Sequence, residues 1–301
     1  METTAWRPLE PRLAMTEAVL AELLDGGQAF RWNRQDGYWE GVWSNYRVRL
    51  RSNGGRLEAV NPAETAAETV SALDRYLAIE RDWPAIMDAL PWRSDAVLAA
   101  AIENWPGLRI LRQPFGETLL CFLCSSTKQI VQIKQLCQAL ALHCGSPIDA
   151  QTAALPTWAQ LHALSEDELR ALKLGYRARY LKQTAAALAE RPESWLNDVA
   201  ALPYAEAKAE LVVLPGVGEK IADCALLFGA GKLEAFPVDT WVLKSMARLY
   251  GLEGWSPSNV AQFGRVHFGP YAGVAQQVLF ASERATSRAE SARSRSPQVH
   301  Q

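Results

Sequence analysis

The early part of the chain alternates apolar and polar residues with the period of β-strands. Segments 28–32, 38–43 and 46–51 alternate aromatic or aliphatic residues with polar ones, which is typical of strands with one buried and one solvated face. Ser52-Asn53-Gly54-Gly55 follows as a hairpin signal, because Asn and Gly tolerate positive φ. The pattern predicts an antiparallel sheet between Gln28 and Val60.

From about Pro62 onward the apolar residues recur with the period of helices, and Pro, Gly or polar clusters separate the runs. The fold class is therefore α+β, with an N-terminal antiparallel sheet domain over 1–110 and a mostly helical body over 111–285. Residues 286–301 are rich in Ser and Arg and have no apolar period, so we expect a disordered basic tail. There is no internal repeat. Helices are predicted over 63–79, 95–104, 116–143, 155–164, 166–173, 178–190, 205–213, 219–230, 240–250, 257–267 and 271–285.

Composition places the chain among ordinary globular proteins. It has 301 residues, 49% hydrophobic and 21% charged, and no apolar run is long enough to span a membrane. No apolar stretch follows a basic start at the N-terminus, so we expect no signal peptide. The expected location is cytoplasm or nucleoid in a bacterium and the nucleus in a eukaryote. Five cysteines are few and odd in number, which argues against a secreted disulfide framework.

The formal net charge of −2 argues against a nucleic-acid binder with a strongly basic surface. However, this sum combines a net acidic segment over 1–100 with a net basic remainder. The charge therefore restricts how the protein binds nucleic acid and does not exclude such binding.

The segment Leu211–Phe228 carries Leu214-Pro215-Gly216-Val217-Gly218 between two predicted helices. Two glycines let the backbone turn sharply and approach another molecule, because no Cβ intervenes. The free amides at the start of the second helix favour an anion. The pattern is typical of a helix-hairpin-helix, which binds a DNA phosphate through backbone amides and needs no lysine cluster. A plain helix–turn–helix connection with a glycine cap is the alternative.

Lys220 and Asp239 are the candidate catalytic pair. Lys220 lies in the first turn of the second helix, where the helix dipole opposes a cation and favours a neutral, nucleophilic amine; a solvated lysine there by chance is the alternative. Asp239 stands where a later helix begins and is also an acceptable N-cap. One helix and a short loop would return Asp239 to Lys220. Such a pair suits chemistry at a sugar carbon, since a carboxylate stabilises the positive charge that develops there.

Leu214–Lys220 followed by Val238-Asp239 resembles the helix-hairpin-helix plus Gly/Pro-Asp signature of the DNA base-excision glycosylases, and most closely their 8-oxoguanine branch. The resemblance continues over roughly 20–285 and implies a TBP-like N-terminal sheet domain followed by a two-lobed helical body. The further segments that carry it are Gly27–Trp32 (an early Gly-Gln-Ser-Phe-Arg-Trp strand in the family), Leu111–Gln113 and Phe122–Ser126 (the start of the helical core), Leu174–Tyr180 (the minor-groove loop) and Gly273–Phe280 (the last core helix).

The resemblance implies that Lys220 is a Schiff-base nucleophile and that Asp239 assists glycosidic cleavage of a base flipped from the duplex. It further implies a base pocket. Gly27 offers its carbonyl to the N7–H that distinguishes 8-oxoguanine from guanine, Cys224 and Phe280 sandwich the base, and Gln276 binds its Watson–Crick edge. Cys224 and Phe280 also fall on apolar helical faces, where ordinary core packing is the alternative.

The resemblance places Gly216 and Gly218 on a DNA phosphate, and Tyr176 and Arg177 in the loop that wedges the duplex. Positive charges gather around this loop at 173, 177, 179 and 182, where they are useful near phosphates; a solvated helix face is the alternative.

Three residues depart from the family pattern. Thr127 replaces an asparagine that fills the vacated space, and Gln132 replaces an arginine that contacts the orphan cytosine. Trp241 stands where the family has a histidine near a phosphate. The changes at 127 and 132 shorten the polar reach, so strict preference for cytosine opposite the lesion is in doubt.

We expect no cofactor and no metal site, and leave open a monovalent cation at the hairpin. Cys121 and Cys124 lie in an apolar run, where free cysteine behaves as a small hydrophobe. Related glycosylases carry an iron–sulfur cluster on cysteines after the catalytic aspartate, and this chain has no cysteine beyond Cys224. The four histidines lack ligand spacing.

The sequence thus predicts a DNA repair glycosylase that excises 8-oxoguanine through a lysine Schiff base, with associated β-elimination at the abasic site. Its expected partner is damaged double-stranded DNA, which it would bind as a monomer. Two alternatives are kept: an alkylpurine glycosylase of the same superfamily, which uses water in place of lysine, and a non-catalytic helix-hairpin-helix DNA-binding module.

Overall fold

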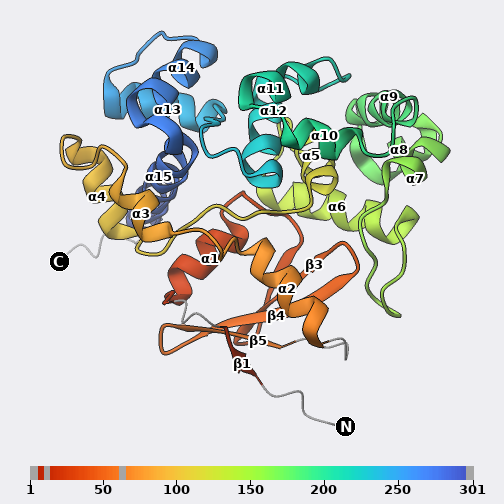
Figure 1. Cartoon of the computed structure of the whole chain (residues 1–301), viewed down its shortest axis with the longest axis horizontal. Helices are drawn as coiled ribbons and strands as arrows, with labels where there is room; N and C mark the ends of the chain where they lie inside the picture. Colours follow the sequence, from red (N-terminus) through yellow and green to blue (C-terminus); the bar gives the residue numbers. More distant parts are fainter. Residues whose placement is uncertain (1–5, 10–13, 61–65, 296–301) are drawn as a thin grey trace.

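A five-stranded antiparallel sheet forms the N-terminal part of the protein, as the alternating pattern predicts (Figure 1). This computed structural model describes residues 6–9, 14–60 and 66–295. The strand order is β1-β5-β4-β3-β2, and Trp39 pairs with Leu50 across the centre. The strands are β1 (Arg7–Pro8), β2 (Trp32–Gln35), β3 (Tyr38–Trp43), β4 (Tyr46–Asn53) and β5 (Arg56–Val60).

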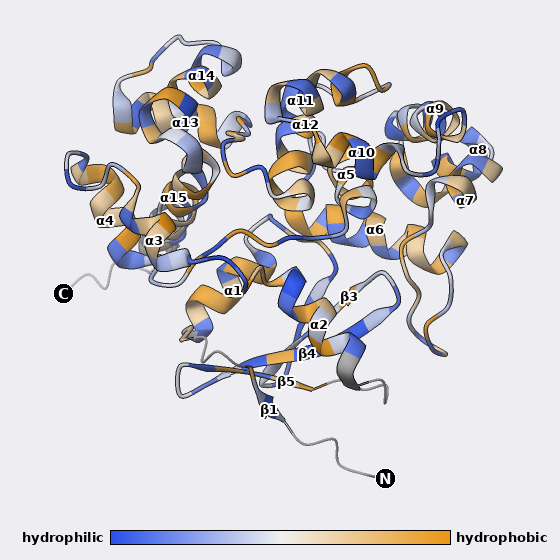
Figure 2. Cartoon of the chain, viewed as in Figure 1, coloured by the Kyte–Doolittle hydropathy of each residue, from blue (hydrophilic) through white to orange (hydrophobic). Residues whose placement is uncertain are grey.

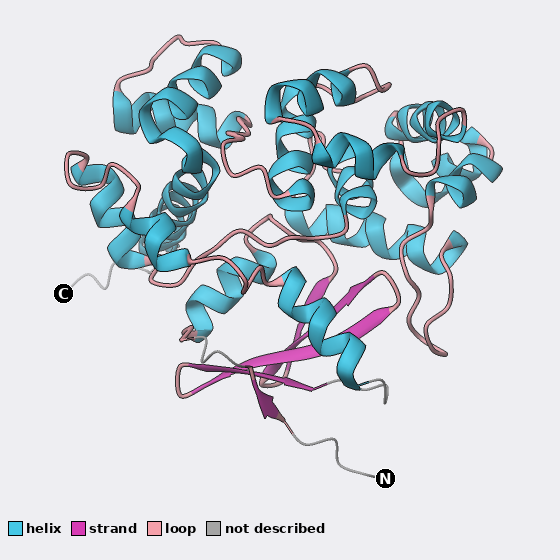
Figure 3. Ribbon diagram, in the orientation of Figure 1, coloured by secondary structure: helices cyan, strands magenta, loops and turns pink. Residues whose placement is uncertain are grey.

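Two helices, α1 (Glu17–Asp25) and α2 (Ala66–Tyr76), contact the sheet and lie between it and the helical body (Figure 3). The sequence prediction missed α1, although the hydroxyl of Thr16 caps it by accepting a hydrogen bond from the Val19 amide at 3.3 Å. The indole of Trp32 donates to the Tyr76 hydroxyl at 2.9 Å, which ties α2 to the edge strand β2.

The helical body has two lobes joined by connecting loops (Figure 1). Most of its helices carry apolar and polar residues on different sides (Figure 2), and the apolar sides form a continuous core. The first lobe comprises α5 (Phe115–Leu123), α6 (Ile130–Cys144), α7 (Trp158–Ala163), α8 (Glu166–Leu169), α9 (Arg177–Ala189), α10 (Trp195–Ala201), α11 (Tyr204–Val212) and α12 (Glu219–Ala225). A kinked turn at Arg170–Leu174, where Lys173 has a φ of 64°, follows α8, and a π-helical turn at Leu226–Ala230 follows α12. The second comprises α3 (Trp83–Asp88), α4 (Ala96–Asn104), α13 (Thr240–Tyr250), α14 (Pro257–Phe268), a short 3₁₀ turn at Gly269–Tyr271 and α15 (Ala272–Arg295).

The second lobe joins distant parts of the sequence. Helix α4 packs against α15, and Asp95, which caps α4, accepts a hydrogen bond from the Tyr250 hydroxyl at 2.9 Å. Nε2 of His267 lies 2.9 Å from the same carboxylate. Residues of the predicted N-terminal segment 1–110 therefore contribute both to the sheet domain and to the C-terminal lobe.

Three local predictions were wrong. The predicted helix over 116–143 is two helices, because the Ser125 hydroxyl donates to the Phe122 carbonyl at 2.7 Å and Thr127 adopts a φ of 53°. The predicted strand over 28–32 begins at Trp32 instead. Helix α15 continues to Arg295, so 286–295 is helical rather than disordered; this stretch has good helix formers and neither Gly nor Pro. Residues 296–301 lie outside the described residues.

Within the described ranges, every helix is too short or too polar to cross a membrane.

Candidate active site

The hairpin connects α11 to α12 and is packed onto α9. Gly216 has a φ of +79°, and a Cβ built on it would lie 2.7 Å from Cβ of Tyr180. Gly218 is the N-cap of α12, and a Cβ there would meet nothing within 4 Å. One glycine is therefore needed for packing inside the protein, whereas the other leaves the amides of α12 open to an outside molecule.

Lys220 is half-buried in the first turn of α12 and points toward the end of α5. Its amine donates to Oγ of Ser125 at 3.2 Å and lies 5.0 Å from the ring centroid of Phe122. These two contacts fix the lysine side chain on one side of the α5–α6 loop.

Asp239 caps α13, as the sequence allowed: its Oδ1 accepts a hydrogen bond from the Val242 amide at 2.8 Å. In the described part of the chain, Oδ2 accepts no hydrogen bond. One oxygen therefore anchors the side chain and the other is available for chemistry.

Cys224 lies one turn after Lys220 and is almost fully buried. Burial raises the pKa of the Cys224 thiol to about 12; the Lys220 ammonium opposes this rise, and the carboxylates of Asp223 and Asp239 add to it. Lys220 and Asp239 therefore both act electrostatically on the Cys224 thiol, and Lys220 and Cys224 share helix α12.

The predicted base-pocket residues come from three elements. A Cβ built on Gly27 would lie 3.5 Å from Cδ1 of Ile130 and 4.0 Å from Cε1 of Phe280, so Gly27 faces the aromatic ring. Gln276 is buried, and its amide donates to the Pro237 carbonyl at 3.3 Å, in the loop that leads to Asp239. The structure thus groups Gly27 with Phe280 and Gln276 with the catalytic loop.

The predicted wedge residues lie beside the α5–α6 loop. The Tyr176 hydroxyl bonds Oγ of Ser126 at 3.0 Å and lies 3.3 Å from Oγ1 of Thr127. Arg177 is buried and donates to the Ser126 carbonyl and to Oγ1 of Thr127, the latter at 2.9 Å. Tyr176 is 47% exposed and Thr127 is also exposed, whereas Arg177 is buried.

Gln132 takes part in the N-terminal cap of its own helix, α6. Its side chain accepts a hydrogen bond from the Gln129 amide at 3.1 Å, which closes a capping box at the start of α6. The hydrogen bonds of Tyr176 and Arg177 go to Ser126, Thr127 and Leu174 instead. Trp241, on the first turn of α13, is 47% exposed.

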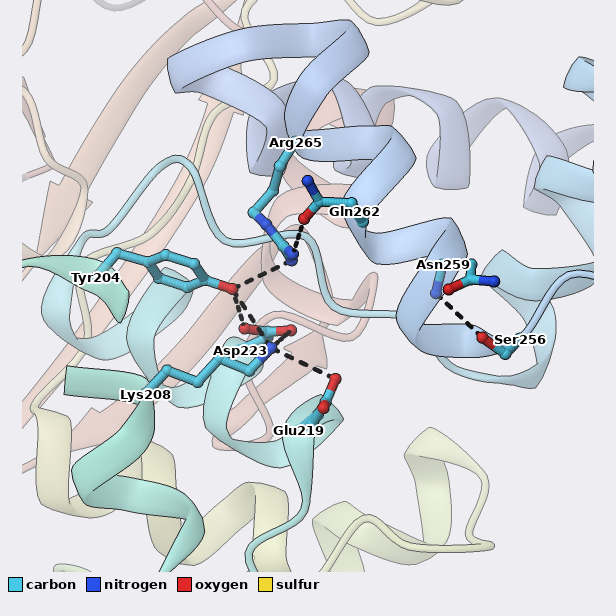
Figure 4. A network of polar contacts seen from close by, with 8 residues as sticks. All are labelled: Tyr204, Lys208, Glu219, Asp223, Ser256, Asn259, Gln262 and Arg265. Atoms are coloured by element: carbon cyan, nitrogen blue, oxygen red, sulfur yellow. Dashed lines mark hydrogen bonds and ion pairs between the residues drawn. The ribbon is translucent and has the colours of Figure 1, made fainter. Parts of the chain in front are cut away.

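A polar network supports the hairpin from behind. Tyr204, Lys208, Glu219 and Arg265 surround Asp223 in Figure 4. Asp223 is buried and accepts from the Tyr204 hydroxyl at 2.6 Å and from the Lys208 amine at 3.0 Å. Burial raises the pKa of Asp223, and Lys208 opposes this rise. Because Asp223 follows Lys220 by one turn, this network ties α12 to α11 and α14.

Sequence reasoning missed several residues that shape the site. Phe122 and Ser125 lie in a segment that carries the family resemblance, but the sequence did not indicate that they contact Lys220. It also did not indicate that Tyr180 packs against Gly216. Spacing carries no signal for such contacts, since each joins separate elements. All five cysteines are free, and the described residues contain no group of three or more His, Cys, Asp or Glu arranged to hold a metal ion.

Comparison with protein families gives two matches that together cover most of the chain. Residues 12–119 match the 8-oxoguanine DNA glycosylase N-terminal domain. Residues 120–268 match the HhH-GPD superfamily of base excision DNA repair proteins. The two matched segments meet within α5, at the start of the first lobe of the helical body.

Individual proteins are similar over nearly the whole length. The N-glycosylase/DNA lyase OGG1 of Arabidopsis thaliana is 31% identical over 303 residues, which cover 93% of this chain and 81% of that protein. The apo structure of the Clostridium acetobutylicum 8-oxoguanine glycosylase/lyase superposes with a TM-score of 0.80 at 34% identity, covering 87% of this chain and 92% of that one. The same enzyme in complex with double-stranded DNA containing cytosine opposite 8-oxoG gives a TM-score of 0.83 at 30% identity, covering 95% and 100%.

Proposed function

The chain belongs to the 8-oxoguanine DNA glycosylase family of the HhH-GPD superfamily, and we propose that Lys220 and Asp239 carry out its chemistry on duplex DNA. It is an N-glycosylase/DNA lyase that excises 8-oxoguanine from DNA. The observation that supports the catalytic pair is that both groups are held with a free reactive atom: the Lys220 amine lies at the N-terminus of α12, 3.2 Å from Oγ of Ser125, and Oδ2 of Asp239 is unpaired in the described part of the chain.

The first step breaks the bond between C1′ of the sugar and N9 of the base. The electron pair of this bond leaves with the base, and positive charge develops at C1′ and the ring oxygen. The free oxygen of Asp239 stabilises this charge. The Lys220 ammonium gives a proton to the departing base, and the resulting amine forms the new bond to C1′. Asp239 needs no proton for this role, because a carboxylate acts here through its charge.

The second step is the lyase reaction. The covalent adduct loses a proton from nitrogen, and the ring oxygen leaves C1′ to become a hydroxyl, which gives a Schiff base between Lys220 and C1′. Removal of a proton from C2′ then expels the 3′ phosphate, and the C3′–oxygen bond breaks. The strand is cut by β-elimination.

Recognition uses the other predicted residues. The Gly27 carbonyl accepts from N7–H of the lesion, Phe280 and Cys224 hold the base between them, and Gln276 contacts its Watson–Crick edge. Undamaged guanine lacks the N7–H, so it leaves the carbonyl unpaired in a buried pocket at a cost of about 1–3 kcal/mol. Because each of these roles needs a flipped base, a non-catalytic DNA-binding module would have no use for them.

Contacts to the duplex complete the proposal. The open amides after Gly218 bind one phosphate, and the exposed Tyr176 ring enters the duplex beside the flipped nucleotide. We place the division between the N-terminal segment and the glycosylase body near residue 110, with α4 of the N-terminal segment packed on α15, and we take the monomer as the acting unit.

Borohydride trapping on an 8-oxoguanine duplex tests the catalytic pair. Wild type should form a covalent adduct, and Lys220→Gln should form none. Asp239→Asn should slow base release at least a hundredfold while preserving the fold, since Asn is as good an N-cap as Asp. Lys244→Gln, at an exposed lysine of α13, is the matched control and should trap like wild type. Full trapping in Lys220→Gln would refute the assignment.

A further inference from the structure

The loop that carries Gly27 passes between two helices. Gly27 has a φ of +107°, which an L side chain rarely adopts, and it faces Ile130 of α6 on one side and Phe280 of α15 on the other. Among the described residues, none donates a hydrogen bond to the Gly27 carbonyl. This carbonyl is therefore available to a ligand, and its direction depends on how the neighbouring peptides are held.

The peptide after Gly27 is fixed by the helical body. The side chain of Gln28 donates to the Arg109 carbonyl at 2.9 Å and accepts from the Leu111 amide at 3.0 Å. The Gln113 side chain donates to the Gln28 carbonyl at 2.6 Å. All of these partners precede α5, so the extended segment 109–113 holds the chain immediately after Gly27.

The peptide before Gly27 is fixed by Arg284. This side chain is 12% exposed, and its guanidinium donates to Oε1 of Glu22 at 3.0 Å and to the Gly26 carbonyl. Its central carbon lies 5.6 Å from the ring centroid of Phe280, one helical turn earlier on α15. One guanidinium thus contacts the loop, the helix α1 and the aromatic ring, and it joins elements from opposite ends of the chain (Figure 1).

Gly26 and Glu22 complete this arrangement. A Cβ on Gly26 would clash with the Glu22 carbonyl and lie 2.5 Å from its Oε1, so the close approach needs glycine. Burial raises the pKa of Glu22, and Arg284 and Arg288 oppose this rise. A buried ion pair adds little net stability compared with apolar residues of similar size. Here the ion pair instead fixes the Arg284 guanidinium in its position on the Gly26 carbonyl.

We propose that Arg284, held by Glu22, is a positioning residue for lesion recognition, which sets the Gly27 carbonyl and the Phe280 ring as one unit. This inference rests on the proposed roles of Gly27 and Phe280. A hydrogen bond weakens steeply when its angle degrades. If the Gly26–Gly27 peptide loosens, the neighbouring Gly27 carbonyl is misdirected and its hydrogen bond with N7–H weakens. Chemistry that needs no base in the pocket is unaffected.

Two single-turnover rates measured on the same full-length variants test this inference. One is release of 8-oxoguanine from a duplex, and the other is β-elimination at a preformed abasic site, which contains no base to read. Arg284→Leu should slow base release at least tenfold and leave the abasic-site rate within about twofold of wild type. Arg284→Lys keeps the charge but loses the planar fork, so its base-release rate should lie between those of wild type and Arg284→Leu.

Arg248→Leu is the matched control, because Arg248 is an exposed arginine that pairs with Glu283, the neighbour of Arg284 on α15. It should leave both rates unchanged. If Arg284→Leu does not fold, Glu22→Gln is measured in its place and should slow base release alone. Equal loss of both rates, or unchanged base release, would overturn the positioning role. Failure of the proposed catalytic pair is recognised separately, since Lys220→Gln would then keep its abasic-site rate.

Discussion

The amine of Lys220 donates a hydrogen bond to Oγ of Ser125 at 3.2 Å, although the two residues are 95 positions apart. The Ser125 hydroxyl proton is already committed to the Phe122 carbonyl at 2.7 Å. Ser125 can therefore only accept from the lysine, and the interruption between α5 and α6 is what presents this acceptor.

Ser125→Ala should reduce both base release and trapping about tenfold, because loss of one orienting hydrogen bond of about 1.4 kcal/mol corresponds to that factor. Ser94→Ala is the matched control: Ser94 also donates to a carbonyl three residues earlier, at 3.1 Å, but is exposed and on the α3–α4 loop. Single-turnover rates with both variants check this expectation. Equal rates for Ser125→Ala and wild type would contradict it.

The two hairpin glycines should respond differently to alanine. Gly216→Ala combines a φ of +79° with a contact to Tyr180, and should lower the free energy of unfolding by about 2 kcal/mol or more. Gly218→Ala meets no neighbour and should cost no more than about 1 kcal/mol.

Affinity for a DNA duplex then distinguishes an effect of each substitution on phosphate binding from its effect on folding. Gly218→Ala should weaken binding to a lesion duplex several-fold, because its methyl group projects to the open side of the hairpin. Thermal unfolding and titration with labelled duplex measure the two effects. Similar loss of stability in both variants, or unchanged affinity in Gly218→Ala, would be inconsistent with this division.

Glu117 should make stability depend on pH. Burial raises its pKa from 4.5 to about 7, although the Ser44 amide donates to it at 2.7 Å and Arg31 lies nearby. Folding therefore favours the protonated acid. Its contribution to stability is complete below about pH 4.5 and is lost as the pH rises to about 7, which amounts to about 3 kcal/mol.

Glu117→Gln keeps the acceptor for Ser44 and removes the titration. Relative to wild type, its free energy of unfolding should therefore rise between pH 5 and pH 8. Urea unfolding at several pH values measures this difference. Parallel pH profiles for the two proteins would show that Glu117 does not titrate in this range.

The preference of the enzyme for the base opposite 8-oxoguanine should be weak, and a substitution at residue 132 should change it. The Gln132 side chain accepts a hydrogen bond from the Gln129 amide at the start of α6. Because no bidentate contact to the orphan base is formed there, we expect the rates of 8-oxoguanine release opposite the four bases to differ by no more than about tenfold. Gln132→Arg should increase preference for cytosine. Gln135→Arg, at an exposed position on α6, adds the same charge and should raise affinity opposite all bases alike. Strong cytosine preference in wild type would refute this expectation.

The sequence by itself determined the sheet and the hairpin, and it predicted the catalytic pair. Alternation over 38–51, two glycines before a helix and a helix-capping aspartate are local patterns, because each reflects the conformation of a few consecutive residues. The resemblance to the glycosylases rests on the same short segments. For this reason Lys220 and Asp239 could be proposed as the catalytic pair without any contact being known.

Only the tertiary structure decided how these residues are held. Ser125 beside Lys220, Tyr180 beneath Gly216 and Arg284 on the Gly26 carbonyl join residues from separate elements, the last pair 258 positions apart. No periodicity specifies such pairs, since each depends on how whole helices pack. The extension of α15 beyond residue 285 has the same origin in part: Glu283 pairs with Arg248 and Arg284 with Glu22. These contacts anchor the helix from which 286–295 continues, whereas composition alone indicated a tail.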